Sequence, residues 1–188
     1  MVARAADAGS MERLAALLSR GGVAIVPCDT MYGIVGAAPE TEERIRRIKG
    51  RGEEKPFLQL IAEASWVHSV SDMAVPAALS RYWPGPLTLI FPARAGGTVA
   101  MRLPDSAFLR QLLAGIGRPL YSTSVNRAGG SPLFDLSEMV REFENDVDLI
   151  FDAGNLPPGP PSTLVDVTGR PFRVLRAGAV RIAPEELA

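Results

Sequence analysis

Short apolar runs alternate irregularly with helix-like segments along this chain, and this alternation constrains its fold more than any other feature. Val23–Val26 and Leu87–Phe91 have the composition of buried strands. Ser10–Ser19 and Thr41–Lys49 carry apolar residues at helical spacing. Several strands follow one another closely enough to be joined as hairpins. We therefore predict an α/β fold in which a single domain, residues 1–188, holds a twisted sheet of mixed parallel and antiparallel strands with flanking helices.

The other elements fit the same architecture. Thr41 is expected to act as the N-cap of its helix, and Ile45 and Ile48 should face the core. Trp83-Pro84-Gly85-Pro86 is expected to be an architectural turn on which Trp83 packs. The remaining predicted helices are Pro76–Tyr82, Ser106–Leu113 and Ser137–Phe143, and the remaining strands are Phe57–Ile61, Val99–Leu103, Leu120–Ser122, Leu149–Phe151, Leu164–Val167 and Phe172–Leu175.

The composition is that of an ordinary globular protein and argues against several classes of function. The chain has 188 residues, of which 47% are hydrophobic and 22% charged, with a formal net charge of −1. So small a net charge gives no global field that attracts nucleic acid or anionic lipid. No apolar run reaches the roughly 18 residues that a membrane span requires. The single cysteine, Cys28, rules out an intrachain disulfide, so we expect a cytoplasmic protein.

Some familiar binding motifs are missing from the sequence. There is no Gly-x-x-x-x-Gly-Lys-Ser/Thr loop, so any nucleotide binding is not of the P-loop kind, and no Gly-x-Gly-x-x-Gly fingerprint follows a strand. His68 is the only histidine, which excludes a histidine-rich metal site, and we predict no resident metal site. Cys28 has no base partner in the sequence and is interpreted as a small packed thiol.

Two distant segments suggest how a polyphosphate could be held against a polar substrate. Lys49-Gly50-Arg51 places two cations together, and Ser122-Thr123-Ser124-Val125-Asn126 groups small hydrogen-bonding side chains. Guanidinium and ammonium groups are the usual phosphate ligands among side chains. Each segment also has a plainer explanation, because cations collect at helix C-termini and Ser/Thr-rich stretches form simple loops.

Five segments, taken in order, resemble one family. They are Pro27-Cys28-Asp29-Thr30-Met31-Tyr32-Gly33, Lys49-Gly50-Arg51, Trp83-Pro84-Gly85-Pro86-Leu87-Thr88, Ser122-Thr123-Ser124-Val125-Asn126 and Pro161-Ser162-Thr163-Leu164-Val165-Asp166. From about Gly21 to Gly178 the chain is similar to the YrdC/Sua5 family, the threonylcarbamoyl-AMP synthases. The resemblance implies a YrdC-like domain with a concave basic cleft. Several positions depart from the family pattern: Cys28 stands where a threonine is usual, Gly52 where a proline is usual, Val125 where a small residue is usual, and Leu60 where some members have a histidine.

The resemblance also implies a role for individual residues. Lys49 and Arg51 would contact ATP and act in catalysis. Arg102 would clamp the threonine carboxylate, although an Arg inside an apolar strand could equally form a structural ion pair with Asp105 or another acid. The full set of implied ATP contacts is Lys49, Arg51, Lys55, Thr98, Ser124, Asn126, Ser131 and Arg176, and the set of implied threonine contacts is Thr30, Tyr32, Arg102, Ser122 and Ser162.

The activity that the resemblance implies is L-threonylcarbamoyladenylate synthesis, a nucleotidyltransferase reaction. L-Threonine, bicarbonate and ATP, with Mg²⁺ arriving on the ATP, would give threonylcarbamoyl-AMP and pyrophosphate. The product would go to a separate tRNA threonylcarbamoyl transferase complex, and a weak RNA contact is possible. Two alternatives stay open: a double-stranded-RNA-binding ribosome maturation factor, and a paralogue of the same fold that acts on another carbamoyl or nucleotide substrate.

Overall fold

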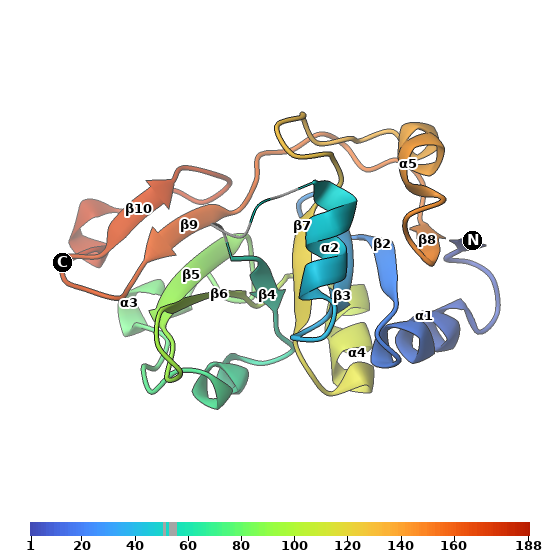
Figure 1. Ribbon diagram of the computed structural model, residues 1–188. Helices are drawn as coiled ribbons and strands as arrows, with labels where there is room; N and C mark the ends of the chain where they lie inside the picture. Colours follow the sequence, from blue (N-terminus) through green and yellow to red (C-terminus); the bar gives the residue numbers. More distant parts are fainter. Residues whose placement is uncertain (51, 53–55) are drawn as a thin grey trace.

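The apolar runs of the sequence form the strands of one long, mixed sheet (Figure 1). The computed structural model describes residues 1–50, 52 and 56–188, and within them ten strands follow the order β1-β8-β2-β3-β7-β4-β6-β5-β9-β10. The strands are β1 (Val2–Arg4), β2 (Val23–Pro27), β3 (Tyr32–Ala37), β4 (Leu58–Leu60), β5 (Leu87–Pro92), β6 (Thr98–Arg102), β7 (Leu120–Ser124), β8 (Leu149–Asp152), β9 (Thr163–Asp166) and β10 (Arg173–Arg176). Parallel pairs such as β4 with β6 adjoin antiparallel pairs such as β4 with β7, which confirms the predicted mixed sheet.

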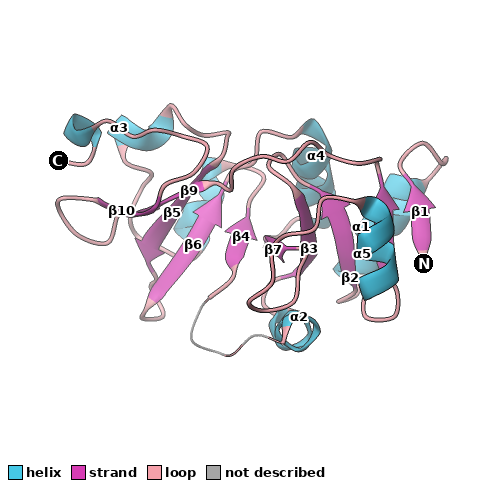
Figure 2. Ribbon diagram, turned by 90° about the horizontal axis from the view of Figure 1, so that it is seen from above, coloured by secondary structure: helices cyan, strands magenta, loops and turns pink. Residues whose placement is uncertain are grey.

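Helices cover both faces of the half of the sheet that includes β2, β3 and β7. Leu14 of α1 and Leu112 of α4 are buried against one face, and Ile45 of α2 and Phe143 of α5 against the other. Figure 2 shows α4 and α2 on opposite sides of the strands. None of the described helices is both long and apolar enough to cross a membrane. The helices are α1 (Ser10–Ser19), α2 (Glu42–Lys49), α3 (Ala77–Ser80), α4 (Ala107–Ile116) and α5 (Leu136–Phe143), with short 3-10 turns η1 (Ala64–Ser69) and η2 (Pro184–Glu186).

The other half of the sheet, built from β5, β6 and β9, has its own core on one face only. Leu87, Phe91 and Val165 pack there against Leu79 of α3 and against Trp83. The indole Nε1 of Trp83 donates a hydrogen bond to Leu87 O at 2.6 Å, so the Trp-Pro-Gly-Pro turn is architectural, as predicted. Residues on the opposite face of β5, β6 and β9 line a cavity.

The strand β3 is missing from the sequence prediction because its two glycines are typical of turns. Both glycines are places where neighbouring residues approach the backbone closely. A Cβ at Gly36 would lie 2.4 Å from Thr41 Oγ1, and one at Gly33 would lie 3.0 Å from Ser122 Oγ. Thr41 occupies the predicted N-cap position of α2, but its hydroxyl donates to Ala37 O at 2.9 Å and makes no capping bond to the helix. The edge strand β1 was not predicted either.

One long connection crosses the sheet. β8 is the second strand from one edge and β9 the second from the other, so residues 153–162 have to pass the strands between them. In Figure 1 this connection runs along the upper side of the molecule from β8 to β9. It brings Gly159, Pro161 and Ser162 to the cavity, so the Gly/Pro-rich loop of the sequence forms one of its walls.

Candidate functional site

A cavity of about 850 Å³ lies on the sheet face that α1 and α4 cover further along. Leu58 of β4 is paired with both Ala100 of β6 and Ser122 of β7, so these side chains stand side by side on the cavity floor. The volume falls within the roughly 300–1,000 Å³ of small-molecule sites. Residues from seven strands and from the crossing connection meet here, so the cavity is the candidate site.

A buried ion pair between Arg102 and Asp29 lies at the cavity. The two side chains are only 4% and 7% exposed. Asp29 Oδ1 accepts from Arg102 Nη2, and Asp29 Oδ2 accepts from the Asp105 backbone N–H at 3.2 Å. The sequence predicted either an ion pair or a ligand clamp for Arg102; the pair is present, and Arg102 lines the cavity as well. Removing either partner alone should cost about 3–5 kcal/mol, because a buried charge would be left uncompensated.

Arg102 keeps one polar atom without a partner. Its Nε is buried and has no hydrogen-bond acceptor among the described residues. A buried donor left unsatisfied costs about 1–3 kcal/mol, so native proteins seldom keep one without a reason. Asp105 does not satisfy it, since its carboxylate pairs with Arg110 at 3.2 Å.

Arg176 reaches the cavity because of a β-bulge. The register of β10 against β9 shifts between Val174 and Arg176, which sets Arg176 opposite Leu164, a residue of the cavity. Without the extra residue, Leu175 would stand there and the guanidinium would be on the other face. Arg176 Nε and Nη2 donate to Ser162 O at 3.1 and 2.9 Å. Partial burial and the nearby charge of Arg102 lower the pKa of Arg176.

The hydroxyl of Ser162 has its own partners. It lies 2.8 Å from Thr88 Oγ1 and accepts from Arg176 Nη2 at 3.1 Å. Gly178 makes this arrangement possible, since a Cβ there would lie 2.3 Å from Pro161 O. The Ser-Thr and Leu-Arg-x-Gly segments therefore act as one packed unit.

Lys49 is fixed at the end of α2 by the polar segment after β7. Its Nζ is buried and donates to Ser124 O at 2.7 Å and to Asn126 Oδ1 at 2.8 Å. Asn126 Oδ1 also accepts from Ser124 Oγ, and its Nδ2 donates to Arg127 O and Gly130 O. Asn126 therefore makes the four hydrogen bonds that a side-chain amide can make and organises the turn around the Lys49 charge.

The segment between β2 and β3 forms another wall. Thr30 and Tyr32 line the cavity, but the Tyr32 hydroxyl is engaged in holding the crossing connection: it donates to Gly154 O at 2.8 Å and accepts from Ala153 N at 3.0 Å. Burial raises the pKa of the Cys28 thiol to about 12. Cys28 is therefore a neutral packed thiol, as predicted, although it also lines the cavity.

The remaining predicted residues lie elsewhere or outside the described residues. Arg51 and Lys55 belong to the latter group. Ser131 is exposed and is not among the residues that line the cavity, although its neighbour Pro132 is. No cluster of three or more His, Cys, Asp or Glu side chains suited to a metal ion occurs within the described ranges.

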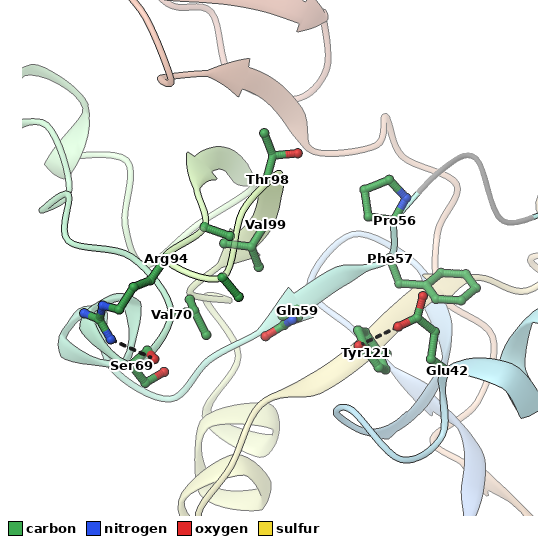
Figure 3. Close-up of a pocket in the computed structure, with 12 residues that line it drawn as sticks. Glu42, Pro56, Phe57, Gln59, Ser69, Val70, Arg94, Thr98, Val99 and Tyr121 are labelled. Atoms are coloured by element: carbon green, nitrogen blue, oxygen red, sulfur yellow. Dashed lines mark hydrogen bonds between the residues drawn. The ribbon is translucent and has the colours of Figure 1, made fainter.

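Thr98 belongs to a second pocket, of about 570 Å³, on the opposite face of the same strands (Figure 3). Phe57, Gln59 and Tyr121 line it and alternate along β4 and β7 with the residues of the cavity floor. The Tyr121 hydroxyl donates to Glu42 Oε2 at 2.8 Å. Pro56, which precedes β4, lines both hollows, so they adjoin at this point.

The fold is an α/β domain with a cavity that presents hydroxyl groups and two guanidinium groups. The chain belongs to the family whose model is named Sua5_yciO_yrdC and described as "Telomere recombination", which matches residues 16–178. It is 31% identical to the threonylcarbamoyl-AMP synthase of Marinobacter nauticus, over 89% of this chain and 100% of that protein. It is 29% identical to that of Pyrococcus abyssi, over 88% of this chain.

The chain spans about half the length of some relatives, 53% of the P. abyssi protein and 52% of the threonylcarbamoyl-AMP synthase of Bacillus subtilis. Among solved structures, P. abyssi Sua5 complexed with L-threonine superposes with a TM-score of 0.84 at 25% identity, covering 95% of this chain and 57% of that one. Escherichia coli YciO superposes with a TM-score of 0.84 at 24% identity over 98% of this chain and 96% of that one, a likeness of fold.

Proposed function

We propose that this chain is an L-threonylcarbamoyladenylate synthase, a nucleotidyltransferase that makes threonylcarbamoyl-AMP and pyrophosphate from L-threonine, bicarbonate and ATP. One observation carries the proposal. Four of the five segments by which the chain resembles its family, far apart in the sequence, contribute residues to a single cavity, and the fifth adjoins it through the hydrogen bond from Lys49 to Ser124 O. Relatives that match most of this chain bear the name threonylcarbamoyl-AMP synthase, and one solved relative holds L-threonine.

The amino-acid end of the site is assigned to the Arg102 side of the cavity. A guanidinium binds a carboxylate with two parallel N–H donors, and the Nε of Arg102 still lacks an acceptor among the described residues. Thr30 and Ser122 line the same cavity and would contribute hydroxyl groups. Tyr32 and Ser162 are already hydrogen-bonded, so they would contact threonine only by sharing or exchanging those bonds.

The nucleotide end is assigned to the Lys49 side. Lys49 is held beside Ser124, which lines the cavity, and the ammonium would neutralise phosphate oxygens there. Asn126 would act next to ATP mainly through its hold on Lys49, and Arg176 would close the site from the C-terminal side. The ATP contacts of Arg51, Lys55, Thr98 and Ser131 remain predictions from the sequence.

The chemistry needs positioning and charge neutralisation more than side-chain acid–base work. The threonine amine joins the carbon of bicarbonate and water leaves, which gives an N-carboxy group. An oxygen of that group attacks the α-phosphorus of ATP, a new P–O bond forms, and the bond to the β-phosphate breaks to release pyrophosphate. Negative charge grows on the phosphoryl oxygens in this step, so a fixed Lys49 would lower its barrier.

Mg²⁺ belongs to this proposal as part of the substrate, bound to the phosphates of ATP, which is its usual way of entering such sites. The product is proposed to pass to a separate tRNA threonylcarbamoyl transferase complex. The RNA-binding alternative gains less support, because two α2 arginines are committed to ion pairs: Arg44 with Asp148 and Arg46 with Glu42, both at 2.6 Å.

The proposal is tested by pyrophosphate release from ATP by the purified chain, with threonine or bicarbonate omitted in turn. Release that requires both substrates supports the synthase. Release with neither would indicate an ATPase-like paralogue. If no pyrophosphate appears, double-stranded-RNA binding should be measured across a salt series, since phosphate contacts weaken steeply with salt.

A further inference from the structure

The charges around the cavity do not balance. Among the described residues that line it, the charged ones are Arg102 and Arg176, and both are cations. Burial is the larger cause of the lowered pKa of Arg176, and the positive charge of Arg102 lowers this pKa further. Asp29 contacts Arg102 without lining the cavity. Arg176 therefore has no anionic partner among the described residues that line the cavity.

Asp29 fixes one end of the Arg102 guanidinium. Each carboxylate oxygen of Asp29 has a separate task, since Oδ1 accepts from Arg102 Nη2 and Oδ2 from the Asp105 backbone N–H. Arg102 is therefore tied to the segment after β6 through Asp29. A guanidinium can bind a carboxylate through two parallel N–H donors, but Asp29 engages only Nη2, and Nε has no acceptor among the described residues.

We propose that Asp29 is a positioning residue, which holds the Arg102 guanidinium so that its Nε is kept for the carboxylate of a ligand in the cavity. Asp29 also offsets one of the two cations among the described residues that line the cavity. The inference rests on the proposed function for the choice of ligand, the carboxylate of an amino acid.

The first test uses the wild-type chain. The ¹⁵N resonance of Arg102 Nε, assigned with the Arg102→Lys variant, is followed while acetate or L-threonine is added. We expect it to shift with both. A shift with acetate but no threonine binding by calorimetry would refute the proposed substrate and leave the role of Asp29 intact. No shift with either compound overturns the inference, whatever calorimetry shows.

The second test compares Asp29→Asn, Asp29→Glu and the control Asp105→Asn, whose exposed side chain pairs with Arg110 instead. Asp29→Asn should weaken L-threonine binding at least about tenfold, as expected for a misplaced binding group, and leave ATP binding unchanged. Asp29→Glu should restore most of the affinity, and Asp105→Asn should behave as wild type. Equal loss of threonine and ATP binding in Asp29→Asn, or no rescue by glutamate, would overturn the inference. If Asp29→Asn does not fold, the wild-type titration decides.

Discussion

Replacing Gly178 by alanine should displace one wall of the cavity. The new Cβ would lie 2.3 Å from Pro161 O and 2.6 Å from both Ser162 C and Thr163 N, all of them backbone atoms that cannot rotate away. An ordinary contact begins at 3.4 Å, so the backbone has to move by about 1 Å. The hydrogen bond from Ala179 N to Pro161 O, 2.9 Å long, lies in the path of this movement.

The expected consequence is large for activity and modest for stability. A shift of about 1 Å moves Ser162 and the acceptor of Arg176, which can cost about 10²-fold in turnover. Overpacking of this kind costs about 1–3 kcal/mol in the free energy of unfolding. Pyrophosphate release and urea denaturation measure the two effects. Gly169→Ala is the matched control, because its Cβ would meet nothing within 4 Å. A Gly178→Ala protein with wild-type turnover would refute the reasoning.

Three further predictions concern single side chains. Lys49→Ala should reduce turnover at least about tenfold while the fold is retained. Arg47 is an exposed cation of the same helix, and Arg47→Ala should leave turnover unchanged. Equal turnover in the two variants would contradict the phosphate role of Lys49. Because burial raises the pKa of the Cys28 thiol to about 12, this thiol should resist iodoacetamide at pH 8 in the native protein and react only after unfolding. Mass spectrometry measures the labelling, and rapid labelling of the native protein would contradict this prediction. The hydrogen bond from Arg44 lowers the pKa of the Asp148 carboxyl below its ordinary value of 3.8. The stability that ionised Asp148 contributes is therefore present above pH 3.8 and is lost as the pH falls through the lower pKa of the folded state. Asp148→Asn should flatten the loss of stability at acid pH in a series of urea denaturations, and an unchanged loss would argue against this account.

Much of the fold follows from local patterns in the sequence. Helix α1 has the predicted bounds, Ser10–Ser19, because leucines at helical spacing and the Gly21-Gly22 pair define its inner face and its end. Ile45 and Ile48 face the core as predicted. The failures arise where the tertiary structure overrides local preference. β3 is a strand despite Gly33 and Gly36, because only glycine leaves room for the side chains that pack on it.

Part of the cavity lining was predictable from the sequence, but the hydrogen-bond and ion-pair partners of these residues were not. The sequence named Thr30, Ser122, Ser124, Ser162 and Arg176, and all of them line the cavity. Other residues named from the sequence, Lys49, Thr98, Asn126 and Ser131, are not among those that line it. The ion pair of Arg102 with Asp29 bridges 73 positions of sequence, and the bulge that aims Arg176 depends on pairing with β9, so neither has a local signal. The position of Asp29 inside the Cys-Asp-Thr segment was the one available hint.

The central claim is that the chain joins threonine, bicarbonate and ATP into one acyl adenylate. The most direct test is mass spectrometry of the reaction mixture with ¹³C-bicarbonate. The account predicts a threonylcarbamoyl-AMP ion that carries the label and is absent without L-threonine. An unlabelled adenylate, or ATP hydrolysis to AMP with no adduct, would contradict it.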